Sequence, residues 1–331
     1  MHVDGRRRKT LLQLVASSVA LNIAPFTHAQ TAKPVRIIVP FPAGGGTDVV
    51  ARIIAEKLRG GYTSSAIVDN RVGASGRLGV EAVKAAEPDG STLLFTPDFL
   101  LTVYPHSFRK LAYNPLTDLG PVAIVTRSQL ALAAGPGLPA DIKTVSDYIN
   151  WTKGDPKRAF YATTSAGATP HFVGVMLARD AGVPLAPVHY KGGAPALQDL
   201  LGGQIPVSVN PVGELLPYVR SGKIRVLATT GAKRSRYLPD VPTMVESGYR
   251  NIVVEAWLGF FAPARTPPET VARIAAAINE AARGPETAQT FDKFGMEAES
   301  ASTPAAVAAI VKADLDTWGP IVKASGFTAD D

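Results

Sequence analysis

The sequence contains no cysteine. That absence excludes disulfide bonds, thiolate nucleophiles and cysteine-ligated metal or iron–sulfur sites. Histidine is also scarce, and two of the five histidines, His2 and His28, lie close to the N-terminus. The other three, His106, His171 and His189, do not have the spacing of a metal-binding motif. The sequence therefore predicts no metal site and no cofactor.

Dense runs of basic residues are missing beyond the N-terminus. The whole chain carries a net charge of +6 at pH 7. The basic residues Arg6 to Lys9 against Asp4 account for +3 of that total, which leaves +3 for the rest of the chain. Nucleic acid is therefore not an expected partner. A mild positive charge suits a small anionic ligand.

The first 29 residues have the pattern of a secretory signal peptide. A basic start is followed by an apolar run from Leu11 to Ala24, which is too short to span a bilayer comfortably. Small residues at Thr27 to Ala29 then offer a cleavage point before Gln30. We expect residues 1–29 to be removed and the mature protein to be periplasmic. A retained anchor is the alternative, and either Sec or twin-arginine export is compatible with the sequence.

Apolar runs and amphipathic segments alternate along the mature chain. Val35–Val39, Thr92–Phe95 and Val122–Val125 are short and apolar, as buried strands are. Thr47–Leu58 carries apolar residues at helical spacing. The same alternation returns between residues 159 and 229. It favours βαβ units and a parallel sheet, and therefore predicts an α/β fold.

Two such sets of strands predict two lobes. Ligands of parallel α/β sheets bind beyond the carboxyl ends of the strands, so we expect a cleft between the lobes. We assign residues 30–127 plus 231–331 to lobe 1 and residues 128–230 to lobe 2.

A glycine-rich loop, PFPAGGGTD, follows the first expected strand at residues 40–48. Glycines leave backbone N–H groups uncovered, and successive N–H groups form an anion-binding nest. The following helix adds free N–H groups and the positive end of its dipole, with Thr47 or Asp48 as its cap. We expect Gly45 in particular to need a positive φ. The spacing fits neither a Walker loop nor a dinucleotide fingerprint, and a tight corner without a ligand stays an alternative.

Several other strand ends carry small polar residues. The segment from Thr163 to His171 offers four hydroxyl side chains ahead of a helix, which indicates a polar binding surface or simple helix caps. Further loops of this kind are Asn70–Arg77, Thr96–Asp98, Tyr190–Gly193 and Asn210–Gly213.

A secreted serine hydrolase that uses Ser165 and His171 is the enzymatic alternative. Ser165 lacks the flanking glycine of a nucleophile elbow, and the sequence indicates no third partner. We therefore expect a protein that is not an enzyme.

In their order, these stretches resemble the Bug-type extracytoplasmic solute receptors, the binding proteins of tripartite tricarboxylate transporters. The resemblance covers residues 33–326. It is carried by IIVPFPAGGGTDVVARIIAEKL, DNRVGASGRLGVEAVKAAEPDGSTLLF, VHYKGGAPALQDLLGGQIPVSVNPVGELLPYVRSGKIRVLATTGAKRSRYLPDVPTMVESGY, AWLGFFAPARTP and WGPIVKASG.

The resemblance implies a two-lobed periplasmic binding protein fold, type II-like, that closes on an organic carboxylate. The ligand-binding residues that it implies in lobe 1 are Phe41, Ala43, Gly44, Gly45, Thr47 and Asp48. Those that it implies in lobe 2 are Thr163, Ser165, Thr169, His171 and Asn210. The resemblance favours Phe41 as an apolar contact for the ligand, whereas the sequence alone favours Phe41 as a core residue.

The chain departs from the family pattern at two places. The family commonly has Gly and Ser near Thr163–Ser165, and Gly-Gly near Ala74–Ser75. These departures leave the identity of the ligand open.

The expected function is that of a periplasmic receptor for a small organic carboxylate. Mono- and dicarboxylates, aromatic ones included, are compatible with the loops. We expect a monomer that passes its ligand to membrane transporter subunits. A sensing subunit that docks on a signalling protein fits the same sequence.

Overall fold

A computed structural model of the protein describes residues 34–329. The segment interpreted as a signal peptide lies outside these residues, so that interpretation stays a prediction. The described residues belong to one compact unit. None of the helices between residues 34 and 329 has both the length and the apolar character needed to cross a membrane.

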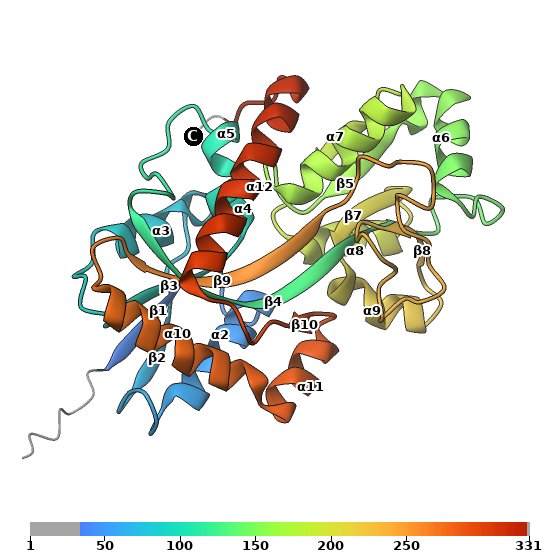
Figure 1. Ribbon diagram of the computed structural model, residues 1–331. Coiled ribbons are helices and arrows are strands. Elements are labelled where there is room, and N and C mark those ends of the chain that lie inside the picture. The colour runs from blue at the N-terminus through green and yellow to red at the C-terminus, as the bar shows by residue number, and fades with distance from the viewer. Residues whose placement is uncertain (1–33, 330–331) are drawn as a thin grey trace, which may run out of the picture. The chain divides into compact units, whose positions relative to one another are not determined.

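The strands of the described chain form one mixed sheet (Figure 1). They are β1 (Val35–Val39), β2 (Ala66–Asn70), β3 (Thr92–Pro97), β4 (Leu119–Ala134), β5 (Phe160–Thr163), β6 (Ala186–His189), β7 (Val207–Pro211), β8 (Arg225–Thr229), β9 (Glu255–Pro263) and β10 (Glu297–Ala298). Their order is β2-β1-β3-β9-β4-β7-β5-β6, with β8 and β10 also paired to β4.

Two sets of parallel strands flank the long antiparallel pair β4–β9. Strand β1 lies parallel to β2 and β3, and β5 lies parallel to β6 and β7. The part of β4 from Leu119 to Gln129 pairs with β9, whereas Leu130–Ala134 pairs with β7 and β8. The alternation in the sequence predicts the parallel units. It does not predict the antiparallel crossing, because it identifies only Val122–Val125 of β4 and no part of β9.

The helices cover the sheet and connect its strands (Figure 1). They are α2 (Gly46–Leu58), α3 (Arg77–Lys84), α4 (Phe99–Thr102), α5 (Tyr104–Ser107), α6 (Val145–Lys153), α7 (Thr169–Ala181), α8 (Gly193–Leu201), α9 (Val212–Arg220), α10 (Pro268–Arg283), α11 (Pro285–Lys293) and α12 (Pro304–Ser325). Helix α2 buries Val50, Ile54 and Leu58, as its apolar spacing predicts. Helix α6 is missing from the sequence prediction, although Thr144 and Asp147 form a capping box at its start.

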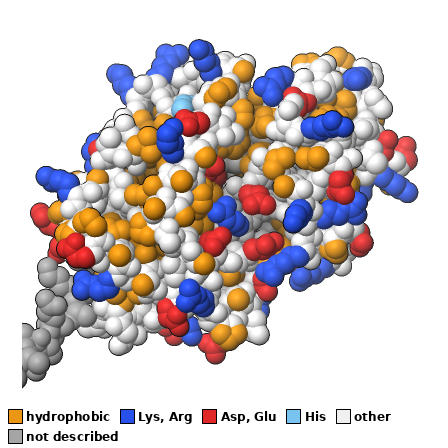
Figure 2. All heavy atoms as spheres, in the orientation of Figure 1, with side chains coloured by type: hydrophobic (Ala, Val, Ile, Leu, Met, Phe, Trp, Pro, Cys, Tyr) orange, Lys and Arg blue, Asp and Glu red, His pale blue; other side chains and the backbone are white. Residues whose placement is uncertain are grey.

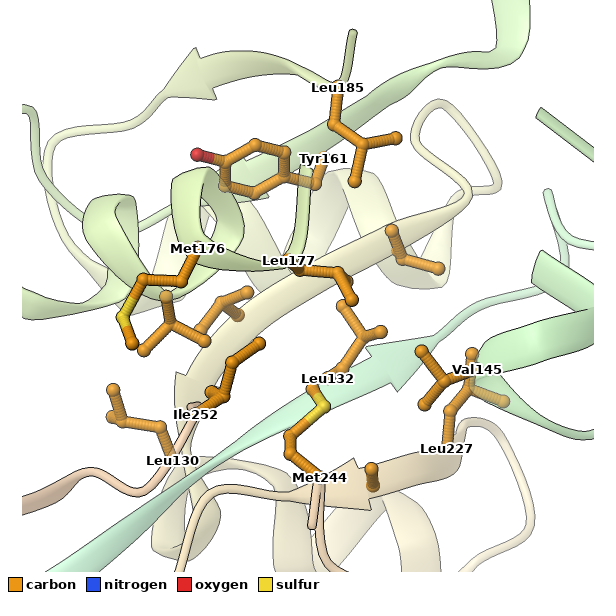
Figure 3. Packing of buried hydrophobic residues seen from close by; sticks show 14 of the residues in the cluster. Leu130, Leu132, Val145, Tyr161, Met176, Leu177, Leu185, Leu227, Met244 and Ile252 are labelled. Carbon is orange, nitrogen blue, oxygen red and sulfur yellow. The ribbon is translucent and has the colours of Figure 1, made fainter. Parts of the chain in front are cut away.

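The buried apolar residues form separate clusters along the sheet. Leu130 and Leu132 of β4 pack with Tyr161 and with Met244 and Ile252 (Figure 3). The last two residues lie in the part of the sequence that we assign to lobe 1, yet they pack with strands assigned to lobe 2. The lobe limits therefore stay a prediction, and this packing favours a limit later than residue 230.

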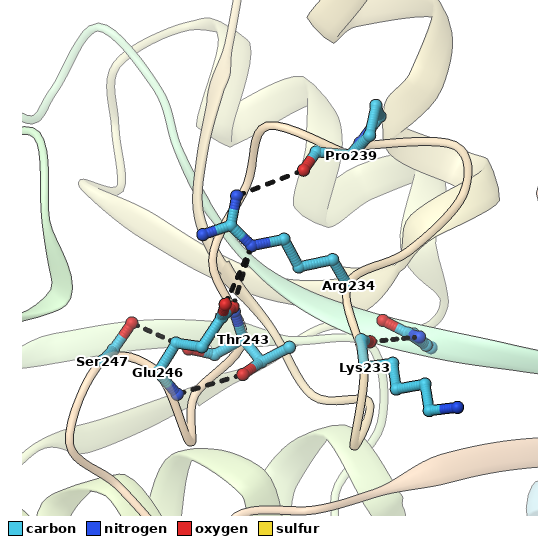
Figure 4. A network of polar contacts seen from close by, with 7 residues as sticks. Lys233, Arg234, Pro239, Thr243, Glu246 and Ser247 are labelled. Atoms are coloured by element: carbon cyan, nitrogen blue, oxygen red, sulfur yellow. Dashed lines mark hydrogen bonds and ion pairs between the residues drawn. The ribbon is translucent and has the colours of Figure 1, made fainter.

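The segment that returns from β8 to β9 is held by a polar network (Figure 4). Arg234 Nε donates to both carboxylate oxygens of Glu246 at 3.0 Å. Glu246 accepts from the Thr243 N–H at 2.7 Å, and the Glu246 N–H donates to the Thr243 hydroxyl. Glu246 thus closes the turn that begins at Thr243, and Arg234 has a structural role in this segment.

Candidate functional site

The glycine-rich loop after β1 is fastened to the neighbouring strand β2. The Gly44 N–H donates to Asp48 Oδ2 at 2.9 Å. Asn70 Nδ2 donates to the Phe41 carbonyl and to Asp48 Oδ1, both at 2.9 Å. Arg52 Nε donates to Asp48 Oδ2 at 2.9 Å. Asp48 therefore accepts the hydrogen bonds that hold the loop in place.

This arrangement gives Asp48 a structural role. Burial would raise its pKa, but the hydrogen bonds from Arg52, Gly44 and Asn70 outweigh burial and hold the pKa below its ordinary value. Asp48 is an anion whose two oxygens accept hydrogen bonds from the protein, so it supports the loop and does not cap α2. Its contact with a ligand stays a prediction. The positive φ, +88°, belongs to Gly44, whereas Gly45 has φ −75°. The expectation for Gly45 is therefore wrong.

The start of α2 nevertheless keeps the donors that an anion needs. Its N-cap is Gly45, and no side chain within residues 34–329 caps it. The first N–H groups of a helix have no partner inside the helix. Ala43, Gly44 and Gly45 are exposed, and Thr47 is half-buried. The main chain at Gly45–Thr47 thus combines accessible N–H groups with the positive end of a helix dipole.

Phe41 lies between this loop and a second, strained loop. Its ring is half-buried and meets the Phe99 ring edge-on, with centroids 6.1 Å apart. A Cβ at Gly76 would lie 3.3 Å from Phe41 Cζ. Residues 73–76 all have positive φ, including Ala74 at +46° and Ser75 at +56°. Apart from Ala74 and Ser75, every residue with a positive φ in the described chain is a glycine.

Tyr104 connects the strained loop with the loop after β5. The Tyr104 hydroxyl donates to the Ser75 carbonyl at 3.3 Å. Burial raises the pKa of Tyr104 to about 12, and hydrogen bonding to Ser165 and Ser75 opposes that shift. Ser75 and Ser165, which are ninety positions apart in the sequence, therefore both lie beside the hydroxyl group of one buried tyrosine.

The loop from Thr163 to Thr169 is held by hydrogen bonds from nearby residues and from Ser107. Thr163 Oγ1 donates to the Ser165 carbonyl at 3.3 Å. The Gly167 N–H donates to His171 Nδ1 at 3.2 Å, and Ser107 Oγ donates to the Gly167 carbonyl at 3.3 Å. Helix α7 then begins without a side-chain cap from the described residues. This loop therefore repeats the plan of the first one: a strand end followed by an uncapped helix start.

His171 holds this loop from inside the protein. It is buried, and its ring packs against His189 and Phe327. Burial, aided by His189, lowers the pKa of His171 to about 4, so the ring is neutral at pH 7. His171 therefore has a supporting role in the loop, and its contact with a ligand stays a prediction. Among the described residues no hydrogen bond joins Ser165 to His171, and the hydrolase alternative has no geometric support.

Asp98 was not expected as a site residue. It is buried at the end of β3, and its pKa is raised to about 8 by burial and by the nearby Asp314. Asp98 Oδ1 and Thr169 Oγ1 both lack a hydrogen-bond partner of standard geometry among the described atoms. The sequence identifies the loop Thr96–Asp98, but Asp314, which helps to raise the pKa of Asp98, lies in α12 more than two hundred residues later.

Asn210 is fully buried at the end of β7. Its Oδ1 accepts from the Ser208 hydroxyl, and its Nδ2 donates to Glu214 Oε2 at 2.9 Å. Both polar atoms of the Asn210 amide group are therefore hydrogen-bonded to other residues of the protein, and Asn210 orients Glu214. Glu214 lies outside the loop Asn210–Gly213 and was not predicted from the sequence, because an acid in the first turn of a helix is common.

One segment connects the β1–α2 loop with the β7–α9 loop. A Cβ at Gly46 would lie 3.0 Å from the Met296 Cε. The preceding residues, Phe294 and Gly295, lie against the backbone of Gly213. The Tyr237 hydroxyl fixes this segment through the Met296 carbonyl at 2.8 Å. Residues 294–296 thus lie between the two loops.

The electrostatics of the surface fit a small ligand better than a large polyanion. Basic and acidic side chains are interspersed on the face shown in Figure 2. A surface depression of about 530 Å³, lined in part by Arg77, Arg109 and Lys110, contains none of the expected ligand residues. Among the described residues, no group of three or more His, Asp or Glu side chains is arranged to hold a metal ion.

The sequence profile of the tripartite tricarboxylate transporter family receptor matches residues 50–327. The chain belongs to this family. The receptor is 32% identical to Protein BugT of Bordetella pertussis over 314 residues, which cover 95% of each chain. The Bug-type resemblance inferred from the sequence is therefore confirmed.

Solved structures share the fold of the receptor. The periplasmic binding protein BugD has a TM-score of 0.78 at 31% identity, covering 90% of this chain and 99% of that one. MatC (Rpa3494) from Rhodopseudomonas palustris, solved with bound malate, has a TM-score of 0.77 at 30% identity, covering 88% and 99%. Rpa4515 of R. palustris, solved with adipate, has a TM-score of 0.79 at 29% identity, covering 89% and 98%. The expected α/β, two-lobed fold of periplasmic binding proteins is confirmed.

Proposed function

We propose that the receptor captures a small organic carboxylate in the periplasm and delivers it to a tripartite tricarboxylate-type transporter. The observation that carries this proposal is the uncapped start of α2 at Gly45, where the exposed glycine loop after β1 ends. The solved relatives with bound malate and adipate support a carboxylate as the ligand. The N-terminal pattern of residues 1–29 supports export.

In this proposal, neutral donors from two loops hold the anion. The first set is the main chain at Gly45–Thr47, and the second is the loop Thr163–Thr169 ahead of α7. A hydrogen bond to a charged group contributes about 1.5–3 kcal/mol. Because both loops end at helix starts, the helix dipoles add to the attraction. Phe41 lies beside the first set and provides an apolar contact for the carbon frame.

Binding would couple to closure of the lobes. Only a closed arrangement makes both sets of contacts, so a ligand that binds both sets shifts the equilibrium towards closure. The buried Tyr104 hydroxyl has both Ser75 and Ser165 as hydrogen-bonding neighbours, so such a movement would change its contacts.

The test is a thermal-shift screen of residues 30–331 with malate, adipate and benzoate, each beside its uncharged amide. A ligand at 100 times its Kd stabilises a protein by about 2.7 kcal/mol, which corresponds to about 5–10 °C in Tm. We expect at least one carboxylate to raise the Tm and its amide to leave it unchanged. Equal shifts with acid and amide, or no shift across a broad carboxylate panel, would contradict the proposal.

A further inference from the structure

A short segment after the last helix, residues 326–329, lies against the loop Thr163–Thr169. Helix α12 ends at Ser325, and Gly326 follows it in the left-handed conformation with φ +69°. The next N–H group, that of Phe327, donates to the Ser325 hydroxyl at 3.0 Å. Residues that follow a final helix are commonly poorly ordered unless contacts fix them. The contacts that fix this segment are therefore informative.

The Phe327 ring packs on the turn of the loop Thr163–Thr169. Gly167 has φ +70°, and a Cβ at Gly167 would lie 3.0 Å from Phe327 Cε1. The ring therefore covers the Gly167 Cα directly and occupies the space that a side chain at position 167 would need.

The same ring contacts His171, which also holds Gly167. The Phe327 and His171 rings meet edge-on, with centroids 4.6 Å apart and planes at 79°. The Gly167 N–H donates to His171 Nδ1 at 3.2 Å. Gly167 is thus held by two rings that contact each other, because one accepts its N–H group and the other covers its Cα.

The end of the segment is fastened to α5. The Ala329 N–H donates to the Ser107 carbonyl at 2.7 Å, and Ala329 pairs with Phe108 in an isolated bridge. Ser107 is fully buried, and its hydroxyl donates to the Gly167 carbonyl at 3.3 Å. Ser107 therefore holds both the C-terminal segment and the loop, so residues 326–329 connect α5 with the turn before α7.

The surroundings of Phe327 differ from those of an ordinary core residue. Its ring is half-buried, whereas the neighbouring Phe172, with a ring centroid 5.9 Å away, is fully buried. The other two rings that it meets are those of His171 and His189. The contacts of Phe327 are thus concentrated on the loop and on the residues that support it. We therefore expect loss of the ring to affect the loop more than the core.

We propose that Phe327 is a positioning residue for ligand capture, which holds Gly167 and His171 so that the loop Thr163–Thr169 presents its donors in a fixed arrangement. Phe327 acts through these two residues and contacts no ligand itself. A loop that is already ordered does not lose conformational entropy when the ligand binds, and so it binds more tightly. This inference rests on the proposed function and adds a residue outside the two proposed sets of donors.

The experiment separates loss of the aromatic ring from loss of stability. Malate, adipate and benzoate are titrated calorimetrically into residues 30–331 of the wild type and of three variants. Phe327→Leu keeps an apolar side chain without the ring, and Phe327→Tyr keeps the ring. Met244→Ala is the control, because Met244 belongs to the apolar cluster on which Phe327 packs but comes from the segment between β8 and β9 (Figure 3). Urea unfolding measures the stability of each protein.

We expect Phe327→Leu to raise the Kd of a bound carboxylate about tenfold, whereas Phe327→Tyr and Met244→Ala stay within about threefold of the wild type. Met244→Ala should nevertheless lower the urea midpoint at least as much as Phe327→Leu does.

Three results would overturn the inference while the receptor function stands. They are an unchanged Kd in Phe327→Leu, an equal loss of affinity in Phe327→Tyr, and an equal loss of affinity in Met244→Ala, which would mean that binding follows overall stability. If the wild type binds none of the carboxylates, the proposed function falls and this inference falls with it.

Discussion

Gly213 and Gly295 pass each other backbone to backbone. A Cβ at Gly213 would lie 1.6 Å from the Phe294 carbonyl oxygen, and a Cβ at Gly295 would lie 2.6 Å from the Gly213 Cα. This crossing brings α9 against the end of α11, beside Met296 and the start of α2. The absence of side chains at both positions is what allows the two segments to meet.

Replacing Gly213 with alanine should therefore destabilise the protein. Overpacking of a tight contact typically costs about 1–3 kcal/mol. We expect the free energy of unfolding of Gly213→Ala, measured in urea, to fall by that amount. Gly61→Ala is the matched control, because a Cβ there meets nothing within 4 Å. Equal stabilities for the two variants would show that the segments are not in contact.

Replacing Gly46 with proline should remove one anion donor and leave the fold intact. Gly46 is the first residue of α2, where proline is tolerated, and the preceding Gly45 has the extended conformation that a following proline favours. Loss of one charge-assisted hydrogen bond costs about 1.5–3 kcal/mol, so the Kd for a bound carboxylate should rise about 10- to 100-fold.

Gly46→Ala is the control for this variant, since it keeps the N–H group and adds a methyl group near the flexible end of Met296. We expect its Kd to stay within a few-fold of the wild-type value. An unchanged Kd in Gly46→Pro would mean that the start of α2 does not hold the ligand.

Glycine at position 74 or 75 should stabilise the protein. Ala74 and Ser75 have φ values of +46° and +56°, which cost about 1–2 kcal/mol for a residue with a side chain. Glycine relieves this cost but makes the unfolded chain more flexible, so the net gain should be about 0.5–1 kcal/mol each. Ala276→Gly, in the exposed interior of α10, should instead destabilise by about 1 kcal/mol. Urea unfolding of the three variants tests the difference in sign.

The buried Asp98 should make stability fall as the pH rises. Its pKa is about 8 in the folded protein against 3.8 ordinarily, so the folded state binds the proton more tightly than the unfolded state. The resulting stability is present below pH 3.8 and is lost as the pH rises to about 8. The pKa of His171 is lowered to about 4, so His171 makes stability rise with pH. This effect is confined to pH values below its ordinary pKa of 6.5.

The window from pH 6.5 to 8 therefore excludes the effect of His171. In that window the Tm of the wild type should fall, whereas Asp98→Asn should be less sensitive to pH and more stable at pH 8. Asp314, whose own pKa is raised chiefly by burial, stays in place in both proteins. A parallel decline in the two proteins would assign the pH dependence to other groups.

The sequence predicted the parts of the fold that depend on local pattern. Val35–Val39 is a strand and the helix after it ends at Leu58, because each carries its own apolar spacing. Most of β4 and all of β9 were not predicted from the sequence. Neighbouring strands and helices bury them on both faces, so they have no alternation of apolar and polar residues. Residues 285–298 were not recognised either, although they border two candidate loops.

The candidate site was predicted at the level of loops and less well at the level of side chains. The glycine loop is exposed, as its composition indicates, but neither Thr47 nor Asp48 caps the helix after it as the sequence led us to expect. Asp48 and His171 have chemistry typical of ligand contacts, but Asn70, Arg52 and Phe327 engage them from distant parts of the chain. Asp98 and Glu214 were missed for the same reason. A side chain's partners decide its role, and those partners are set by tertiary packing.

The most direct test of the account is a crystal structure of residues 30–331 with the carboxylate selected by the thermal-shift screen. The account requires the ligand's carboxylate oxygens to lie within hydrogen-bond distance of the N–H groups at Gly45–Thr47 or of the loop Thr163–Thr169. A carboxylate bound elsewhere, for example by Arg77 and Arg109 in the surface depression, with the start of α2 left to solvent, would contradict it.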